Sequence, residues 1–165
     1  MGCTAAGKST ALRHNPEIKA MVEKAGLVYD GAFNSVPSFE TRLKMVQDRG
    51  FKASIVFVHN DPETGFTNMI NRMIKSNRAM SFYYYVLSYP RFHGRIAYLQ
   101  ENHPDVELYC LDNNHNNGGV QVSIEEALKW DYHMSEQMEQ RLYDIMNEFI
   151  DSGRLTPEQI QALKN

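Results

Sequence analysis

The sequence has little cysteine, little net charge and no long apolar run, and each shortage narrows the class of protein. Only two cysteines, Cys3 and Cys110, occur in 165 residues without a disulfide pattern, which indicates a reducing, cytoplasmic environment. The formal net charge of −3 argues against a protein that binds nucleic acid by neutralising phosphates. No apolar run approaches the roughly 18 residues that span a bilayer, and the polar N-terminus does not resemble a signal peptide. We therefore expect neither nucleic acid nor a membrane as a partner.

Helical and apolar strand patterns alternate along the chain, and 42% hydrophobic content is enough for one well-packed core. The strands that we predict are 27–31, 53–60, 106–112 and a short one at 120–122. The helices that we predict are 9–26 with a break at Asn15-Pro16, 37–49, 62–76, 81–102 with a disturbance at Pro90, 123–151, and a short one after Thr156.

This alternation predicts an α/β fold with a short parallel sheet between layers of helices. We assign residues 1–122 to the sheet-containing domain and residues 123–165 to a helical C-terminal extension packed on it. Ligands of such sheets bind beyond the carboxyl ends of the strands. The loops after Val28, Val58 and Leu111 are therefore the places where we expect functional residues.

The first nine residues contain the phosphate-binding pattern G-x-x-x-x-G-K-[ST], from Gly2 to Ser9. Glycines let successive backbone N–H groups turn onto phosphate oxygens, Lys8 would reach the β- and γ-phosphates, and the Ser9 hydroxyl would ligate Mg²⁺. Thr10 can add a hydroxyl toward the α-phosphate. The nucleotide-binding residues that we predict are Gly2, Cys3, Thr4, Ala5, Ala6, Gly7, Lys8, Ser9 and Thr10, with ATP and Mg²⁺ as the cofactors.

A glycine-containing turn that happens to precede a helix would give the same pattern without binding a nucleotide. Chance agreement somewhere in a chain of this length is on the order of 1%, which favours a nucleotide phosphate site in a P-loop NTPase domain. A P-loop normally follows a buried strand, and only Met1 precedes Gly2 here. The sequence therefore predicts a phosphate cradle whose supporting strand is missing from this chain.

Three further charged residues are candidates for phosphoryl transfer. Asp30 lies where the predicted strand 27–31 ends, and a carboxylate there could orient or deprotonate an acceptor hydroxyl, although an aspartate before Gly31 is also typical of a simple turn. Arg72 and Arg78 flank a short polar break and could neutralise the charge on a transferred phosphoryl group. Taken alone, such arginines are more often solvated helix surface. Together with Lys8, these residues form the catalytic set that we predict.

The order of these segments resembles the zeta-toxin family of P-loop kinases. The resemblance runs from residue 2 to about residue 113 and rests on GCTAAGKST, VYDGAFNS, SIVFVHNDPETGFTNMINRMIKSNRAM and DVELYCLDN. It implies transfer of the ATP γ-phosphate to a hydroxyl of a UDP-amino sugar or a related small molecule, and an antitoxin protein as a candidate partner. Lys8 and Ser9 match the residues that hold ATP and Mg²⁺ in the family.

Other parts of the family pattern are matched less completely. Arg72 and Arg78 match the two lid arginines, and Asp30-Gly31 matches the acid-Gly-Thr turn at the substrate, but Ala32 replaces its threonine. The strand that carries the family's catalytic aspartate has no obvious counterpart between Thr10 and Gly26, so Asp30 either acts as the base or no base exists. The alternatives are a non-catalytic nucleotide-binding module, a fragment of a larger protein, or a different P-loop NTPase that hydrolyses ATP.

Overall fold

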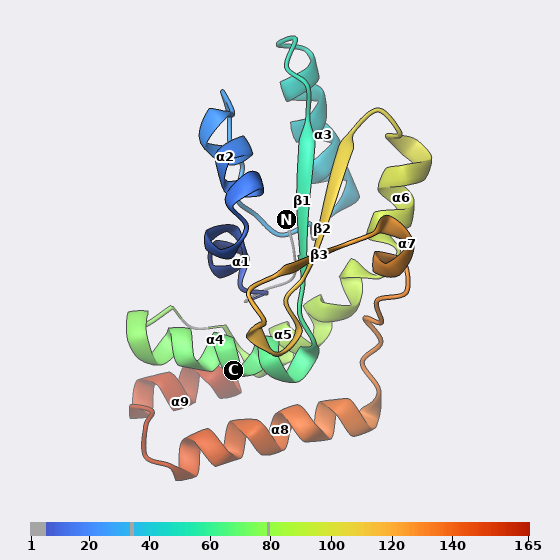
Figure 1. Cartoon of the computed structure of the whole chain (residues 1–165). Coiled ribbons are helices and arrows are strands. Elements are labelled where there is room, and N and C mark those ends of the chain that lie inside the picture. Colours follow the sequence, from blue (N-terminus) through green and yellow to red (C-terminus); the bar gives the residue numbers. More distant parts are fainter. Residues whose placement is uncertain (1–5, 34, 79) are drawn as a thin grey trace.

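The computed structural model describes residues 6–33, 35–78 and 80–165, and they form an α/β fold with a small open sheet (Figure 1). The strands are β1 (Ser54–His59), β2 (Glu107–Asp112) and β3 (Val120–Val122). The helices are α1 (Lys8–His14), α2 (Pro16–Lys24), α3 (Val36–Gln47), α4 (Pro62–Ser76), α5 (Phe82–Ser88), α6 (Arg95–Asn102), α7 (Ile124–Ala127), α8 (Glu136–Asp151) and α9 (Pro157–Lys164). Two short 3₁₀ turns, η1 (Tyr89–Phe92) and η2 (Asn114–Asn116), follow α5 and β2.

The sheet of the described residues is mixed, whereas the sequence led us to expect a parallel one. β1 and β2 pair in parallel from Ser54↔Glu107 to His59↔Asp112, as predicted for a crossover through helices. β3 runs antiparallel to β2. A parallel connection needs a dozen or more residues, but only residues 113–119 separate β2 from β3. The short connection therefore forces the chain to turn back on itself.

The predicted strand 27–31 is wrong, because the structure gives these residues no regular secondary structure. Among the described residues no strand pairs with this segment, so its backbone has no ladder in which to bond. Its apolar side chains are not buried either, since Leu27 is 60% and Val28 is 55% exposed. Asp30 therefore lies in an exposed irregular segment rather than at the end of a strand.

Helix boundaries agree best with the sequence where a cap defines them. Asp61 caps α4 by accepting a hydrogen bond from the backbone nitrogen of Thr64 at 2.8 Å, with Pro62 as the first helical residue. Thr156 and Gln159 form a reciprocal capping box at the start of α9. The predicted break at Asn15-Pro16 separates α1 from α2. These signals are local, so tertiary packing does not override them.

Two predicted long helices are interrupted. The segment 81–102 divides into α5 and α6 around the η1 turn and Gly94, whose positive φ of 70° ends the regular backbone. The predicted helix 123–151 is wrong as a single element, because α7 stops at Ala127 and α8 starts only at Glu136. Trp130 lies in the intervening segment and stacks on His59 of β1 with ring centroids 4.6 Å apart. The segment between α7 and α8 packs against the sheet instead of continuing the helix.

Helix α7 packs on β2, whereas α8 lies along α4 and α9 lies beside α4 and α5 (Figure 1). Arg141 of α8 pairs with Glu63 of α4 at 3.1 Å, and the side-chain nitrogen of Gln159 in α9 donates to the carbonyl of Met73 at 3.1 Å. None of the helices formed by the described residues combines the length and apolarity that crossing a bilayer requires.

Candidate functional site

The described end of the phosphate-binding motif lies at the carboxyl ends of β1 and β2. The backbone nitrogen of Asn113 continues the ladder by donating to the carbonyl of His59 at 2.9 Å. The side-chain nitrogen of the same Asn113 donates to the carbonyl of Ala6, also at 2.9 Å. Both Ala6 and Asn113 are fully buried. The buried side-chain amide of Asn113 therefore holds Ala6, the residue before the second glycine of the motif, next to the end of the sheet.

Two features of the structure require a glycine at position 7. Its φ of +78° lies in the left-handed region, which residues with a side chain rarely adopt. A Cβ atom built on Gly7 would also lie 2.4 Å from the side-chain nitrogen of Asn113. The carbonyl of Gly7 accepts hydrogen bonds from the backbone nitrogens of Thr10 and Ala11, at 2.9 and 2.8 Å, and thereby starts α1. This geometry of a turn followed directly by a helix fits a loop that approaches phosphate groups.

Of the predicted nucleotide-binding residues, Gly2, Cys3, Thr4 and Ala5 lie outside the described residues. Lys8 and Thr10 are half-buried in the first turn of α1, and Ser9 is exposed there. The amine and the hydroxyl that the motif assigns to phosphates and Mg²⁺ thus come from adjacent residues on one helical turn. No group of three or more His, Cys, Asp or Glu side chains that could hold a metal ion occurs in the described part of the chain.

A cavity of about 310 Å³ opens beside this turn, between α1, α2, α3 and β1. Lys8, Ser9 and Asp30 all line it, so the structure brings three of the predicted functional residues to one cavity. Tyr29, the residue before Asp30, lies under the guanidinium of Arg42 in α3, with 4.2 Å between the Arg42 Cζ atom and the ring centre. This cation–π contact fixes the exposed segment 27–31 against α3.

The two predicted lid arginines lie elsewhere. Arg72 is exposed in α4, and Arg78 is exposed two residues beyond the end of that helix. Neither residue lines the cavity beside Lys8. Their part in phosphate binding stays a prediction.

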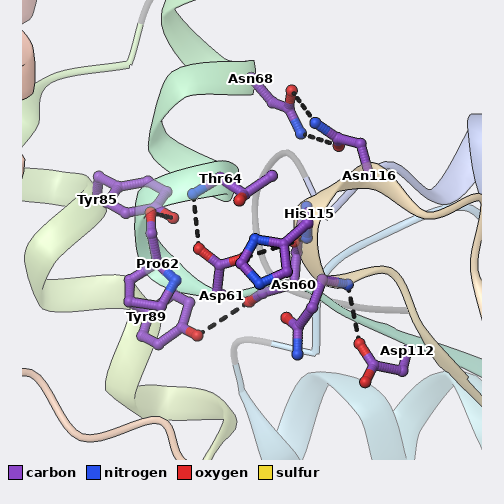
Figure 2. Close-up of polar contacts among 11 residues, drawn as sticks. Asn60, Asp61, Pro62, Thr64, Asn68, Tyr85, Tyr89, Asp112, His115 and Asn116 are labelled. Carbon is purple, nitrogen blue, oxygen red and sulfur yellow. Dashed lines mark hydrogen bonds and ion pairs between the residues drawn. The ribbon is translucent and has the colours of Figure 1, made fainter.

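Sequence reasoning missed a polar cluster at the same carboxyl edge (Figure 2). Asp61 accepts hydrogen bonds from the backbone nitrogens of Thr64 and His115, at 2.8 and 3.4 Å. Burial opposes ionisation of Asp61, but the hydrogen bonds from Thr64 and His115 outweigh it and lower the pKa of the carboxyl group. On the neighbouring loop, Asp112 accepts from the backbone nitrogen of Asn114 at 2.8 Å. These carboxylates hold the loops after β1 and β2 in place.

Asn60, directly after β1, is fully buried, and neither its side-chain oxygen nor its side-chain nitrogen has a hydrogen-bond partner among the described residues. Its backbone carbonyl accepts from the hydroxyl of Tyr89 at 3.0 Å, as Figure 2 shows. The preceding His59 is buried as well, and burial lowers its pKa to about 4. The signal for both residues was present in the sequence, since polar side chains directly follow the apolar run of β1.

Comparison of the chain with known protein families and with curated proteins found no match. The structure defines the class of protein as α/β. The described end of the motif lies at the carboxyl ends of its two parallel strands. The resemblance to zeta toxins therefore rests on the sequence motifs alone.

Proposed function

We propose that this protein is a kinase-like P-loop protein that binds MgATP and transfers the γ-phosphoryl group to a hydroxyl of a small molecule. The observation that carries the proposal is the lining of one cavity by Lys8 and Ser9 from the motif together with Asp30. The motif residues Lys8 and Ser9 line the part of this cavity that follows the loop held at the carboxyl edge of the sheet, where ligands of α/β proteins bind. The buried contact from Asn113 to Ala6 supports a preorganised loop at this edge.

Each residue then has a defined task. The ammonium group of Lys8 neutralises β- and γ-phosphate oxygens, and the Ser9 hydroxyl is the protein ligand for Mg²⁺. MgATP, when bound, supplies the phosphoryl group. The carboxylate of Asp30 accepts the proton of the acceptor hydroxyl, and the exposed side chain can reach the cavity that it lines. The resemblance to zeta toxins adds a UDP-amino sugar as the expected acceptor and an antitoxin as an expected partner.

Calorimetric titration with MgATP tests nucleotide binding. We expect the wild-type chain to bind and Lys8→Ala to bind about 10- to 100-fold more weakly, because a charge-assisted contact is worth about 1.5 to 3 kcal/mol. Lys24→Ala is the matched control, since Lys24 is an exposed lysine that does not line the cavity. Equal affinity of the Lys8 and Lys24 variants, or no binding by the folded wild-type chain, would contradict the proposal.

A non-catalytic nucleotide-binding module is the second candidate, and one observation favours it. Asp30 lies in an exposed segment with which none of the described strands pairs, and such a segment holds a catalytic base less firmly in place than a strand does. Acceptor-dependent release of ADP by wild type and Asp30→Asn separates the candidates. A kinase loses at least about 100-fold in turnover in this variant while keeping its MgATP affinity. A binding module shows no acceptor-dependent turnover in either protein.

A further inference from the structure

The charged residues that line the cavity beside the motif do not balance one another. Lys8, Arg42 and Lys52 contribute cationic groups, whereas Asp30 is the one carboxylate in the described lining. Within the described chain, none of these cations lies within ion-pair distance of a carboxylate. Lys8 serves the phosphates of MgATP in the proposed function, which leaves two cations against one carboxylate in the rest of the cavity. A second ligand is therefore favoured there by a negative charge.

Arg42 of α3 is held in a way that suits the binding of an oxyanion. Its guanidinium lies over the ring of Tyr29, with 4.2 Å between the Arg42 Cζ atom and the ring centre. A guanidinium that stacks on a ring uses its face, whereas its N–H donors lie in its plane and stay available to a phosphate or a carboxylate. Asp30 follows Tyr29 directly, and the two side chains of Arg42 and Asp30 do not form an ion pair. The stacking therefore fixes a cation beside the segment of the predicted base without neutralising that base.

Arg42 also lines a second cavity, of about 300 Å³. Tyr29 and Phe39 line both cavities as well, so the two cavities are neighbours. Ser38 adds a hydroxyl group to the lining of the second cavity. Ser38 and Arg42 are four residues apart in α3, so their side chains lie on one face of the helix. A guanidinium and a hydroxyl on one face together offer several hydrogen-bond donors to the oxygens of one anionic group.

We propose that Arg42 and Ser38 bind the phosphate or carboxylate group of the acceptor, and that Arg42 thereby selects anionic acceptors. The role as an acceptor site rests on the proposed function, whereas the chemical class of the ligand rests on the charges and donors of the two cavities. The acceptor hydroxyl then lies on the Asp30 side of Arg42. Its oxygen forms a bond to the γ-phosphorus, and the bond from that phosphorus to the bridging β–γ oxygen breaks. ADP leaves with the bonding pair, and the hydroxyl proton passes to the Asp30 carboxylate.

The first experiment titrates the Lys8→Ala chain with glycerol 3-phosphate, glycerate and glycerol in a calorimeter. Removal of the motif lysine leaves the second site to account for anion binding. We expect the two anions to bind more tightly than glycerol, and the tighter of the two identifies a phosphate ester or a carboxylate as the ligand. Adding Arg42→Gln should weaken anion binding by about tenfold or more, because charge-assisted hydrogen bonds are lost. Arg42→Lys keeps the charge but not the planar fork and should fall between.

Arg49→Gln is the matched control, since Arg49 is an exposed arginine just after α3 that lines neither cavity. Equal anion affinities of the Arg42→Gln and Arg49→Gln variants would overturn the site. Equal affinities for glycerol and its two anionic forms would overturn it as well.

The second experiment measures ADP release by the wild-type chain from MgATP with these three compounds and with glucose, glucuronate and glucose 1-phosphate. We expect faster release with the anionic members, and a kcat/KM for them that falls about tenfold or more in Arg42→Gln. Neutral compounds that equal the anionic ones would overturn the acceptor role, and so would anion binding at Arg42 without turnover of any anionic compound. Failure of the proposed function itself would appear separately, as absent MgATP binding by the wild-type chain beside intact anion binding that depends on Arg42.

Discussion

The burial of His59 makes the stability of the fold depend on pH. His59 is 4% exposed, stacks on Trp130, and shares a 2.9 Å hydrogen bond between its Nδ1 atom and the hydroxyl oxygen of Tyr132. Burial lowers its pKa to about 4, although the nearby carboxylates of Asp112 and Asp61 act in the opposite direction. The imidazole is therefore neutral in the folded protein at pH values where the unfolded chain, with a pKa of 6.5, already takes up a proton.

The magnitude follows from the two pKa values. Above pH 6.5 His59 is neutral in the folded and the unfolded chain and does not reduce the stability. As the pH falls from 6.5 toward about 4, the unfolded chain binds a proton at His59 and the free energy of unfolding decreases. At pH 5 the unfolded chain is almost fully protonated at this site and the folded chain is not, which reduces the free energy of unfolding by about 2 kcal/mol. The complete loss at lower pH is about 3 kcal/mol.

Urea denaturation at several pH values between about 8 and 5 measures this effect. His59→Gln removes the titrating group, so we expect a lower absolute stability, because the stacking on Trp130 is lost, but a flatter pH dependence. His93→Gln is the control, since His93 is exposed and its replacement should leave the wild-type slope intact. A wild-type slope that persists in His59→Gln would refute the reasoning.

Two further predictions concern the buried contacts at the carboxyl edge. Gly7→Ala should destabilise the fold by about 2 kcal/mol, half from the left-handed backbone and half from displacing Asn113. Gly153→Ala, at a φ of +67° with open space around it, should cost only about 1 kcal/mol in thermal or urea unfolding, and equal losses would argue against the clash. Asn60→Leu should stabilise the fold by about 1 kcal/mol because it removes two buried atoms without partners, whereas Asn113→Leu should destabilise it by breaking the contact with Ala6. A loss of stability in Asn60→Leu would mean that its amide is satisfied.

Local signals in the sequence predicted the helices that begin at a capping residue and the strands that are continuous apolar runs. Asp61-Pro62 placed the start of α4, Thr156-Pro157 placed the start of α9, and the apolar runs placed β1 and β2. Each of these signals acts within a few residues, through one hydrogen bond to a backbone nitrogen or through side-chain alternation along a strand. They are therefore readable without knowledge of the partners in space.

The errors occurred where distant residues decide the outcome. The segment LVYDG has the composition of a strand, but a strand needs a neighbour to pair with, and the described residues provide none. The predicted helix 123–151 is divided before Ser135, whose hydroxyl caps α8 by accepting from the backbone nitrogen of Met138, and in the gap Trp130 stacks on His59 of the sheet. Local capping by Ser135 and packing of Trp130 over a long sequence separation therefore both act in this segment.

At the candidate site, the motif and hence the chemistry that we assign to Lys8 and Ser9 are evident from the order of the amino acids alone. The tertiary structure decided which other residues share their cavity. It brought Asp30 to that cavity, placed Arg72 and Arg78 outside it, and fixed Ala6 through the buried amide of Asn113. A motif specifies groups that lie within one turn of the chain, whereas a cavity is formed by walls from several elements. Its volume and lining therefore depend on how those elements pack, and only the folded chain supplies that information.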